Sequence, residues 1–123
     1  MNFRPWYYVA IAVMIPSAAS AMPVSMFLPR VEALQKKGPM ALFSKDLEVL
    51  TNQVKADLGE IRSERLAAKT AGQPAEFCPP SEGGKFTDKD IISAMRAVPV
   101  QQRASTSTKS ALKALLIRRY PCP

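Results

Sequence analysis

Two cysteines, Cys78 and Cys122, are the residues whose type and spacing indicate the most definite chemistry. Cys78 is followed by two prolines, and Cys122 is the last residue but one. An even number of cysteines in an exported chain usually forms disulfides, and only one pairing exists here. The bridge would close a loop of about 45 residues, whose loop-closure entropy is worth about 4 kcal/mol. The alternative is two free thiols, one of them catalytic, which would need a neighbouring base.

The chain contains no histidine, so it lacks the most common general base and the most common metal ligand. It also lacks the nucleophile-elbow, phosphate-loop and dinucleotide-binding glycine motifs. Asp88 and Asp90 come nearest to a carboxylate metal site, and they are better explained as residues that cap a helix. We therefore expect a protein that is not an enzyme, with no catalytic residues, no metal site and no cofactor.

The charge balance is basic, with 17 Lys and Arg residues against 10 Asp and Glu residues and a net charge of +7. Such an excess suits nucleic acid, an acidic protein or an anionic envelope surface, and it also serves solubility alone. The basic residues are scattered among acidic ones, and no aromatic stacking surface accompanies them. The sequence therefore predicts no nucleic-acid partner, whereas an acidic protein, an anionic surface and solubility alone all stay open.

The first 21 residues have the order of parts that is typical of a cleaved secretory signal peptide. Arg4 supplies the positive charge, and residues 6–15 form an uncharged apolar run. Ala19 and Ala21 give the small residues of a cleavage site just before Met22. The apolar run is too short to cross a bilayer as a permanent helix. We expect export to the periplasm with no stable membrane anchor; the alternatives are an uncleaved anchor and an ordinary buried helix.

The remaining residues, 22–123, have the length of a single small domain and show no convincing period-two alternation. They predict an all-α fold, a small bundle of about four helices. The clearest helix spans 45–71 behind the capping residue Ser44. Its apolar residues recur at steps of three and four and form a narrow stripe, which would pack on the domain's own helices or on a second copy, so a homodimer stays an alternative. This stripe comprises Leu47, Leu50, Val54, Leu58 and Ile61.

Three shorter helices are predicted around the long one. The first runs from Ser25 toward Lys37, unless Pro29 delays its start to Leu28 or to Pro29 itself. The other two helices and their boundaries follow from capping residues and prolines: Thr87 or Asp88 to Pro99, and Ser105 or Ser107 to Arg119.

Short motifs in the C-terminal half resemble a known family. They are Phe77-Cys78-Pro79-Pro80, the turn at Val98-Pro99, Ala111-Leu112, Ala114-Leu115 and Tyr120-Pro121-Cys122-Pro123. Together they make residues 77–123 similar to the Rap1a/Tai family of immunity proteins, which are small, exported and helical. The resemblance implies a disulfide between Cys78 and Cys122. It also implies a protein that binds and blocks a cell-wall amidase effector of a type VI secretion system.

The N-terminal half departs from that family, whose members often carry a further cysteine pair near a Gly-Tyr segment. The resemblance therefore transfers no effector-contact residue. We expect a periplasmic protein-binding module that occludes an enzyme, with a cell-wall amidase toxin as the candidate partner and contacts in the 72–85 linker and the 99–107 connection. The alternative is a general envelope protein that binds an anionic cell-wall or lipid ligand. The candidate contact residues are Lys85, Gln101, Gln102, Arg103, Lys109 and Lys113.

Overall fold

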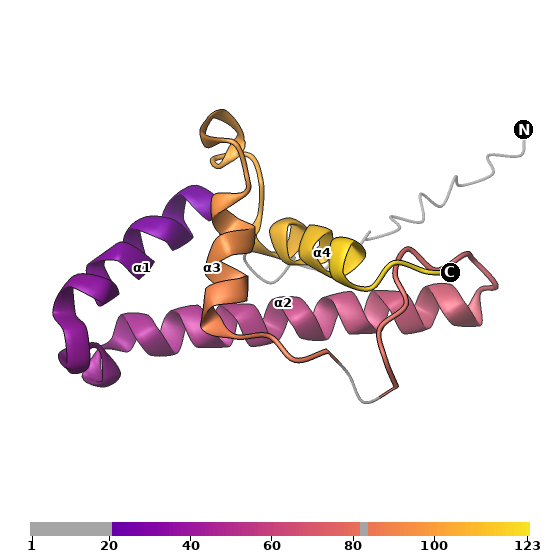
Figure 1. Ribbon diagram of the computed structural model, residues 1–123, viewed down its shortest axis with the longest axis horizontal. Coiled ribbons are helices and arrows are strands. Elements are labelled where there is room, and N and C mark those ends of the chain that lie inside the picture. The colour runs from indigo at the N-terminus through magenta and orange to yellow at the C-terminus, as the bar shows by residue number, and fades with distance from the viewer. Residues whose placement is uncertain (1–20, 82–83) are drawn as a thin grey trace, which may run out of the picture.

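The computed structural model describes residues 21–81 and 84–123, and these residues form helices joined by loops (Figure 1). The predicted all-α fold with about four helices, one of them long, is confirmed. The α-helices are α1 (Val24–Lys37), α2 (Lys45–Thr70), α3 (Asp88–Arg96) and α4 (Thr108–Arg119), and two 3₁₀ helices, η1 (Gly38–Phe43) and η2 (Val100–Gln102), lie between them.

Three helices begin at hydroxyl residues that the sequence predicts as caps. The side-chain oxygens of Ser44, Thr87 and Ser107 accept hydrogen bonds from backbone N–H groups two or three residues later, at 3.3, 3.2 and 3.1 Å. Each bond satisfies a donor that has no partner inside its own helix. The predicted starts of α2, α3 and α4 are therefore confirmed, and Ser107 rather than Ser105 caps the last helix.

Helix α1 begins earlier than the sequence predicts. We expected a start at Ser25 or, because of Pro29, as late as Leu28 or Pro29 itself, yet the helix begins at Val24 and carries Pro29 inside it. A proline inside a helix costs about 3 kcal/mol. Tertiary contacts fix the first turn against that cost: Val24 is fully buried, and its backbone N–H donates to the Thr106 carbonyl oxygen at 2.9 Å. The ring of Pro29 is exposed and disturbs no core packing.

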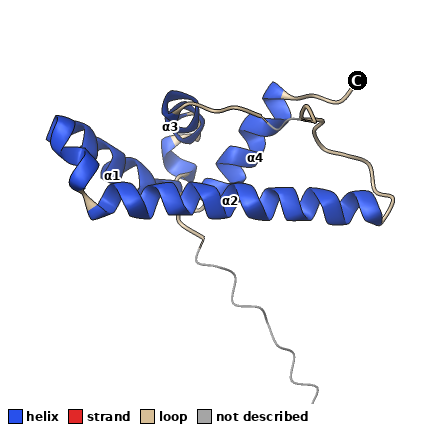
Figure 2. Cartoon of the chain, turned by 90° about the horizontal axis from the view of Figure 1, so that it is seen from below, coloured by secondary structure: helices blue, strands red, loops and turns tan. Residues whose placement is uncertain are grey.

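Helix α2 is the longest helix of the described residues. At 1.5 Å per residue its 26 residues span about 39 Å. Helix α1 packs on its first part, α4 crosses its middle, and α3 packs on α1 and α4 (Figures 1 and 2). One core joins these elements: Val24, Phe27, Leu28, Val31, Leu34, Leu50, Ile61, Phe77, Met95, Ala111, Leu112 and Leu116.

A hydrogen bond between Thr108 and Asp57 lies inside this core, where α4 crosses α2. Thr108 is fully buried, Asp57 is 4% exposed, and the hydroxyl of Thr108 donates to Oδ2 of Asp57 at 2.5 Å. The amide of Gln53 donates to the other carboxylate oxygen at 2.9 Å. The backbone N–H of Thr108 donates to the carbonyl oxygen of Met22 at 2.9 Å. A buried carboxylate needs such donors, so these bonds fix α2, α4 and the start of the described chain at one point.

The disulfide predicted from the sequence is confirmed. Cys78 and Cys122 are bonded, with 4.9 Å between their Cα atoms. Beside the bridge, the backbone N–H of Cys78 donates to the carbonyl oxygen of Tyr120 at 2.7 Å. The bridge and this bond hold the end of the chain against the segment that follows α2.

The predicted signal peptide falls almost wholly on residues 1–20, including Ala19, which lie outside the described residues. Of its predicted cleavage site, Ala21 is exposed and Met22 is half-buried. Among the helices that the structure describes, none is long and apolar enough to span a membrane.

Thr108→Val should lower the free energy of unfolding by about 1.5–3 kcal/mol, because a buried carboxylate loses a hydrogen-bond donor that water cannot replace. The matched variant Thr108→Ser keeps the hydroxyl and should cost about 1 kcal/mol for the lost methyl group. Urea unfolding followed by far-ultraviolet circular dichroism measures both. Equal losses in the two variants would show that the hydroxyl contributes nothing.

Replacing both cysteines (Cys78→Ser with Cys122→Ser) should lower the free energy of unfolding by about 2–4 kcal/mol, because the unfolded chain regains the entropy that the closed loop removes. Urea unfolding of the double variant and of the oxidised protein measures the difference. Reduction of the unmodified protein should give the same loss. An unchanged midpoint in the double variant would contradict a stabilising bridge.

Candidate functional site

Two of the predicted contact residues, Lys109 and Lys113, form ion pairs within the protein. The ammonium group of Lys109 pairs with Glu64 and, at 3.1 Å, with Glu60 on helix α2. That of Lys113 pairs with Glu76 at 2.8 Å. The hydrogen bond to Glu64, and then the one to Glu60, raises the pKa of Lys109. Both lysines thus tie α4 to the face of α2 and to the loop that follows it.

The other four predicted contact residues lie apart from these lysines. Arg103 is half-buried, and its guanidinium donates to the carbonyl oxygens of Val98 at 2.9 Å and Arg96 at 3.1 Å. Gln101 and Gln102, in η2, are exposed, and so is Lys85 at the opposite end of α4. The structure therefore does not gather the six residues into one surface. Their contact with a partner stays a prediction.

Asp90 caps a helix, as the sequence predicts. Its carboxylate accepts the backbone N–H of Thr87 at 2.9 Å and pairs with the guanidinium of Arg119 at 3.1 Å. The bond from the Thr87 backbone and then the one from Arg119 lower the pKa of Asp90. Within residues 21–81 and 84–123, no group of three acidic or cysteine side chains is placed to hold a metal ion.

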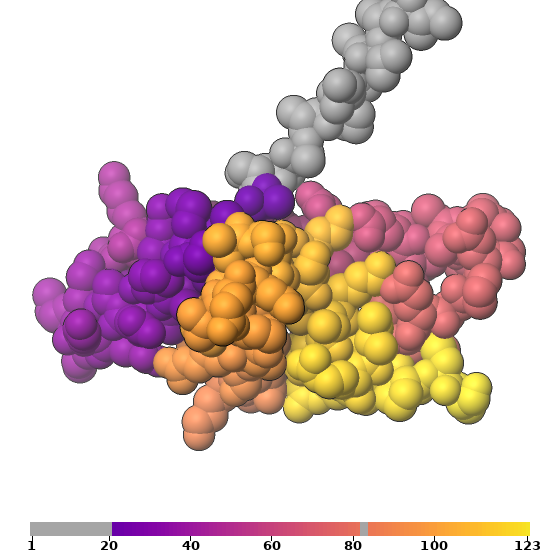
Figure 3. Space-filling view, turned by 90° about the horizontal axis from the view of Figure 1, so that it is seen from above, coloured from indigo at the N-terminus to yellow at the C-terminus, as the bar shows by residue number. Residues whose placement is uncertain are grey.

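Three large apolar side chains close together in the sequence are strongly exposed at the turn between α1 and α2, whereas the similarly exposed Val100 (72%) stands alone in η2. Gly38, whose φ is 57°, ends α1, and the six residues of η1 turn the chain back (Figure 1). Ala41 is half-buried, whereas Met40, Leu42 and Phe43 are 65%, 75% and 83% exposed. We call these three residues the apolar corner. They form one end of the molecule, in the purple part of the space-filling view (Figure 3).

Lysines precede and follow the apolar corner along the chain. Lys36 and Lys37 end α1, and the ammonium group of Lys37 donates to the cap residue Ser44 at 3.3 Å, which joins the two helix ends. A shallow groove of about 430 Å³ continues from Leu42 and Phe43 along the first turns of α2. Its other lining residues are Ser44, Lys45, Leu47, Glu48, Thr51, Asn52 and Lys55.

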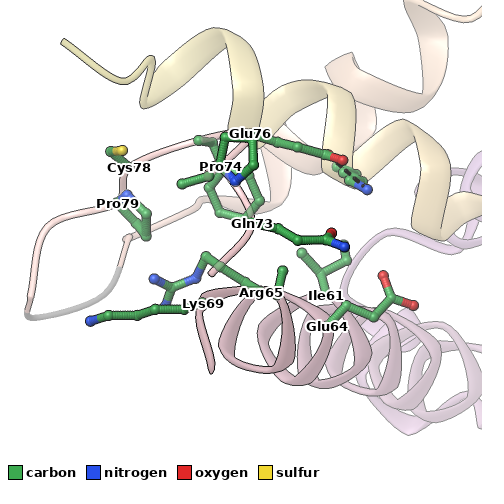
Figure 4. A pocket seen from close by; sticks show the side chains of 13 residues that line it. Ile61, Glu64, Arg65, Lys69, Gln73, Pro74, Glu76, Cys78 and Pro79 are labelled. Carbon is green, nitrogen blue, oxygen red and sulfur yellow. Dashed lines mark ion pairs between the residues drawn. The ribbon is translucent and has the colours of Figure 1, made fainter. Parts of the chain in front are cut away.

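A deeper cavity of about 520 Å³ lies at the opposite end of α2, and we call it the distal cavity. It lies between the last turns of α2, the 73–79 loop and α4. Figure 4 shows Arg65 and Lys69 side by side, reaching from α2 toward the segment that carries Pro79, while Glu64 points the other way. The other lining residues are Ile61, Ala68, Gln73, Pro74, Ala75, Glu76, Phe77, Cys78 and Lys113.

The guanidinium of Arg65 lies over an aromatic ring at the bottom of this cavity. Its central carbon is 5.9 Å from the centroid of Phe77, a distance at which the ring face attracts a cation. Phe77 is 5% exposed, and Ile61 beside it is 3% exposed. A second cavity of about 390 Å³ shares Ile61, Arg65, Phe77 and Pro79 with the first. Arg65 and Phe77 therefore border both cavities.

Sequence reasoning did not identify the apolar corner or the distal cavity as sites. The overlooked signal is the presence of three large apolar residues, Met40, Leu42 and Phe43, within four positions between two helices. Arg65 continues the spacing of the apolar stripe of α2, where its stem can pack while its head group reaches water. No pattern in the sequence could reveal that Phe77 lies under that head.

Comparison of the chain with family models, with curated proteins and with solved structures finds no match. The similarity of residues 77–123 to the Rap1a/Tai family therefore stays a prediction. The periplasmic location and the amidase partner are untested in the same way.

Asp90→Asn should lower the melting temperature at neutral pH, because the charged carboxylate holds both the Thr87 backbone and Arg119. Folding depresses the pKa of Asp90 below its ordinary value of 3.8, so the stabilisation is present above that value and is lost as the pH falls through the lower, folded pKa. Thermal unfolding of both proteins between pH 7 and strong acid measures the difference. A gap in melting temperature that stays constant down to strong acid would contradict this account.

Proposed function

We propose that this protein is an exported binding protein that blocks a partner enzyme by inserting the apolar corner into a recess of that enzyme. The observation that carries the proposal is the exposure of Met40, Leu42 and Phe43, at 65–83%, within four successive residues. Isolated exposed apolar residues are normal, but a contiguous group marks an interaction site. Aromatic and methionine side chains are also enriched at the centres of protein interfaces.

The shape of the corner favours a different protein over a second copy. A two-fold interface brings the same surface patch of each copy together. Two projecting turns that meet tip to tip bury little area, whereas a stable interface buries on the order of 1,200–2,000 Å². A projecting turn is complementary to a concave surface, such as the cleft of an enzyme.

The lysines near the apolar corner indicate which charge the partner's recess should carry. Lys36 and Lys37 end α1 just before the corner, and Lys45 and Lys55 line its groove together with one carboxylate, that of Glu48. Carboxylates on the rim of the partner's recess would complement these lysines and speed association. We therefore expect an apolar recess bordered by acidic side chains.

Residues 77–123 and the N-terminus suggest which enzyme is blocked. The Rap1a/Tai resemblance and the predicted signal peptide together favour a cell-wall amidase that acts in the periplasm. Occlusion requires no catalytic group on the binding protein, which agrees with a chain that contains no histidine. The corner is independent of the resemblance, because it lies in the half that departs from the family.

The test is protection of cells from lysis. The full chain is produced in cells that export, one at a time, each cell-wall amidase encoded beside its own gene. We expect the chain to prevent lysis by one of them, and Phe43→Ser to weaken binding of that enzyme by about 2 kcal/mol, or about thirtyfold, as for a central interface residue. Lysis assays and titration calorimetry measure the two effects.

The matched control is Leu66→Ser, which removes an exposed apolar side chain, 46% accessible, from another face. It should protect cells as the unmodified protein does. If the chain protects cells against none of these amidases, the proposed function is contradicted. Equal protection by Phe43→Ser, or a purified protein that is dimeric until Phe43 is replaced, would contradict the role of the corner.

A further inference from the structure

We propose that the distal cavity binds an amphiphilic carboxylate, an apolar chain that ends in a carboxylate group. The head group would lie between Arg65 and Lys69 (Figure 4), and the chain would lie against the apolar residues that line the cavity, Ile61, Ala68 and Phe77. This site lies at the other end of α2 from the apolar corner, and it does not rest on the proposed function.

The fold leaves this space open for a physical reason. Helix α4 crosses the middle of α2, so the last turns of α2 extend beyond it (Figure 2). A loop rather than a helix covers those turns, and the bridge between Cys78 and Cys122 holds that loop against the chain's end. An extended loop carries too few side chains to fill a gap between helices. The cavity of about 520 Å³ falls in the range of small-molecule sites.

The charges on the wall favour an anion. The two carboxylates that line the cavity are already occupied, Glu64 by Lys109 and Glu76 by Lys113. Arg65 and Lys69, one helical turn apart, form no ion pair with any residue of the described ranges. Two adjacent cations with no partner among these residues repel each other, and a bound anion would relieve that repulsion.

Arg65 is held ready to bind a carboxylate. The central carbon of its guanidinium lies over the Phe77 ring, 5.9 Å from the ring centroid. A planar guanidinium donates two parallel hydrogen bonds to a carboxylate. Because the ring restrains the group before binding, less entropy is lost when the ligand arrives.

The rest of the wall favours an apolar chain over a peptide. Gln73 is the one neutral polar side chain among the residues that line the cavity. A peptide would bring several amide groups that lose water where they contact the wall and need hydrogen-bond partners there. A hydrocarbon chain needs none, and Ile61, Ala68, Phe77 and the prolines offer it apolar contact.

The experiment titrates the purified full chain with dodecanoate, below its micelle concentration, by isothermal calorimetry. We expect one saturable site for dodecanoate. Dodecanol, which has the same chain without the charge, should bind with an affinity at least about tenfold lower. Methyl resonances of Ile61 and Ala68 should shift on addition of dodecanoate in nuclear magnetic resonance spectra. The absence of saturable binding, or equal binding of dodecanol, would overturn the proposal.

Substitutions of charged residues test where the carboxylate head group binds. Arg65→Gln should weaken dodecanoate binding about tenfold, and Lys69→Gln, on the surface of the helix, should weaken it several-fold. Lys89→Gln removes the same charge from an exposed position on α3 and should change affinity by less than about twofold. Phe43→Ser at the apolar corner should leave binding unchanged. If both cavity variants behave as Lys89→Gln does, the site is not this cavity.

Discussion

The hydrogen bond between Thr108 and Asp57 is the contact on which the rest of the structure depends. It lies where the longest helix and the last helix cross, and neither side chain is accessible enough for water to replace its partner. Met22 is joined to the same point through the backbone of Thr108. Because the crossing is at the middle of α2, both ends of that helix extend beyond it. One end carries the apolar corner and the other forms a wall of the distal cavity.

The sequence predicts most of the fold because the signals are local. Ser44 and Thr87 each cap a helix through a bond to a residue two or three positions away, and apolar residues at steps of three and four indicate one long helix. The bridge was predictable because two cysteines allow one pairing. The start of α1 was not predictable. Val24 is held by a hydrogen bond to Thr106, 82 residues later, and that contact outweighs the local effect of Pro29.

The candidate sites were less predictable because they depend on what distant residues leave uncovered. Lys109 was expected to be free for a partner, yet Glu60 and Glu64 on another helix pair with it. Asp57 falls in the apolar stripe of α2, and only Thr108, 51 residues away, explains why a carboxylate is buried there. Exposure at the corner depends on which elements reach the turn between α1 and α2, and the sequence does not reveal that.

Native-state hydrogen exchange of the full chain, read residue by residue, tests the central claim that a rigid crossing presents an uncovered corner. Amides are protected in proportion to the free energy needed to open the structure around them. The account predicts the slowest exchange in α2 near Asp57 and in α4 just after Thr108, and fast exchange from Gly38 to Phe43. Fast exchange at the crossing, or protection of the corner as strong as that of the crossing, would contradict it.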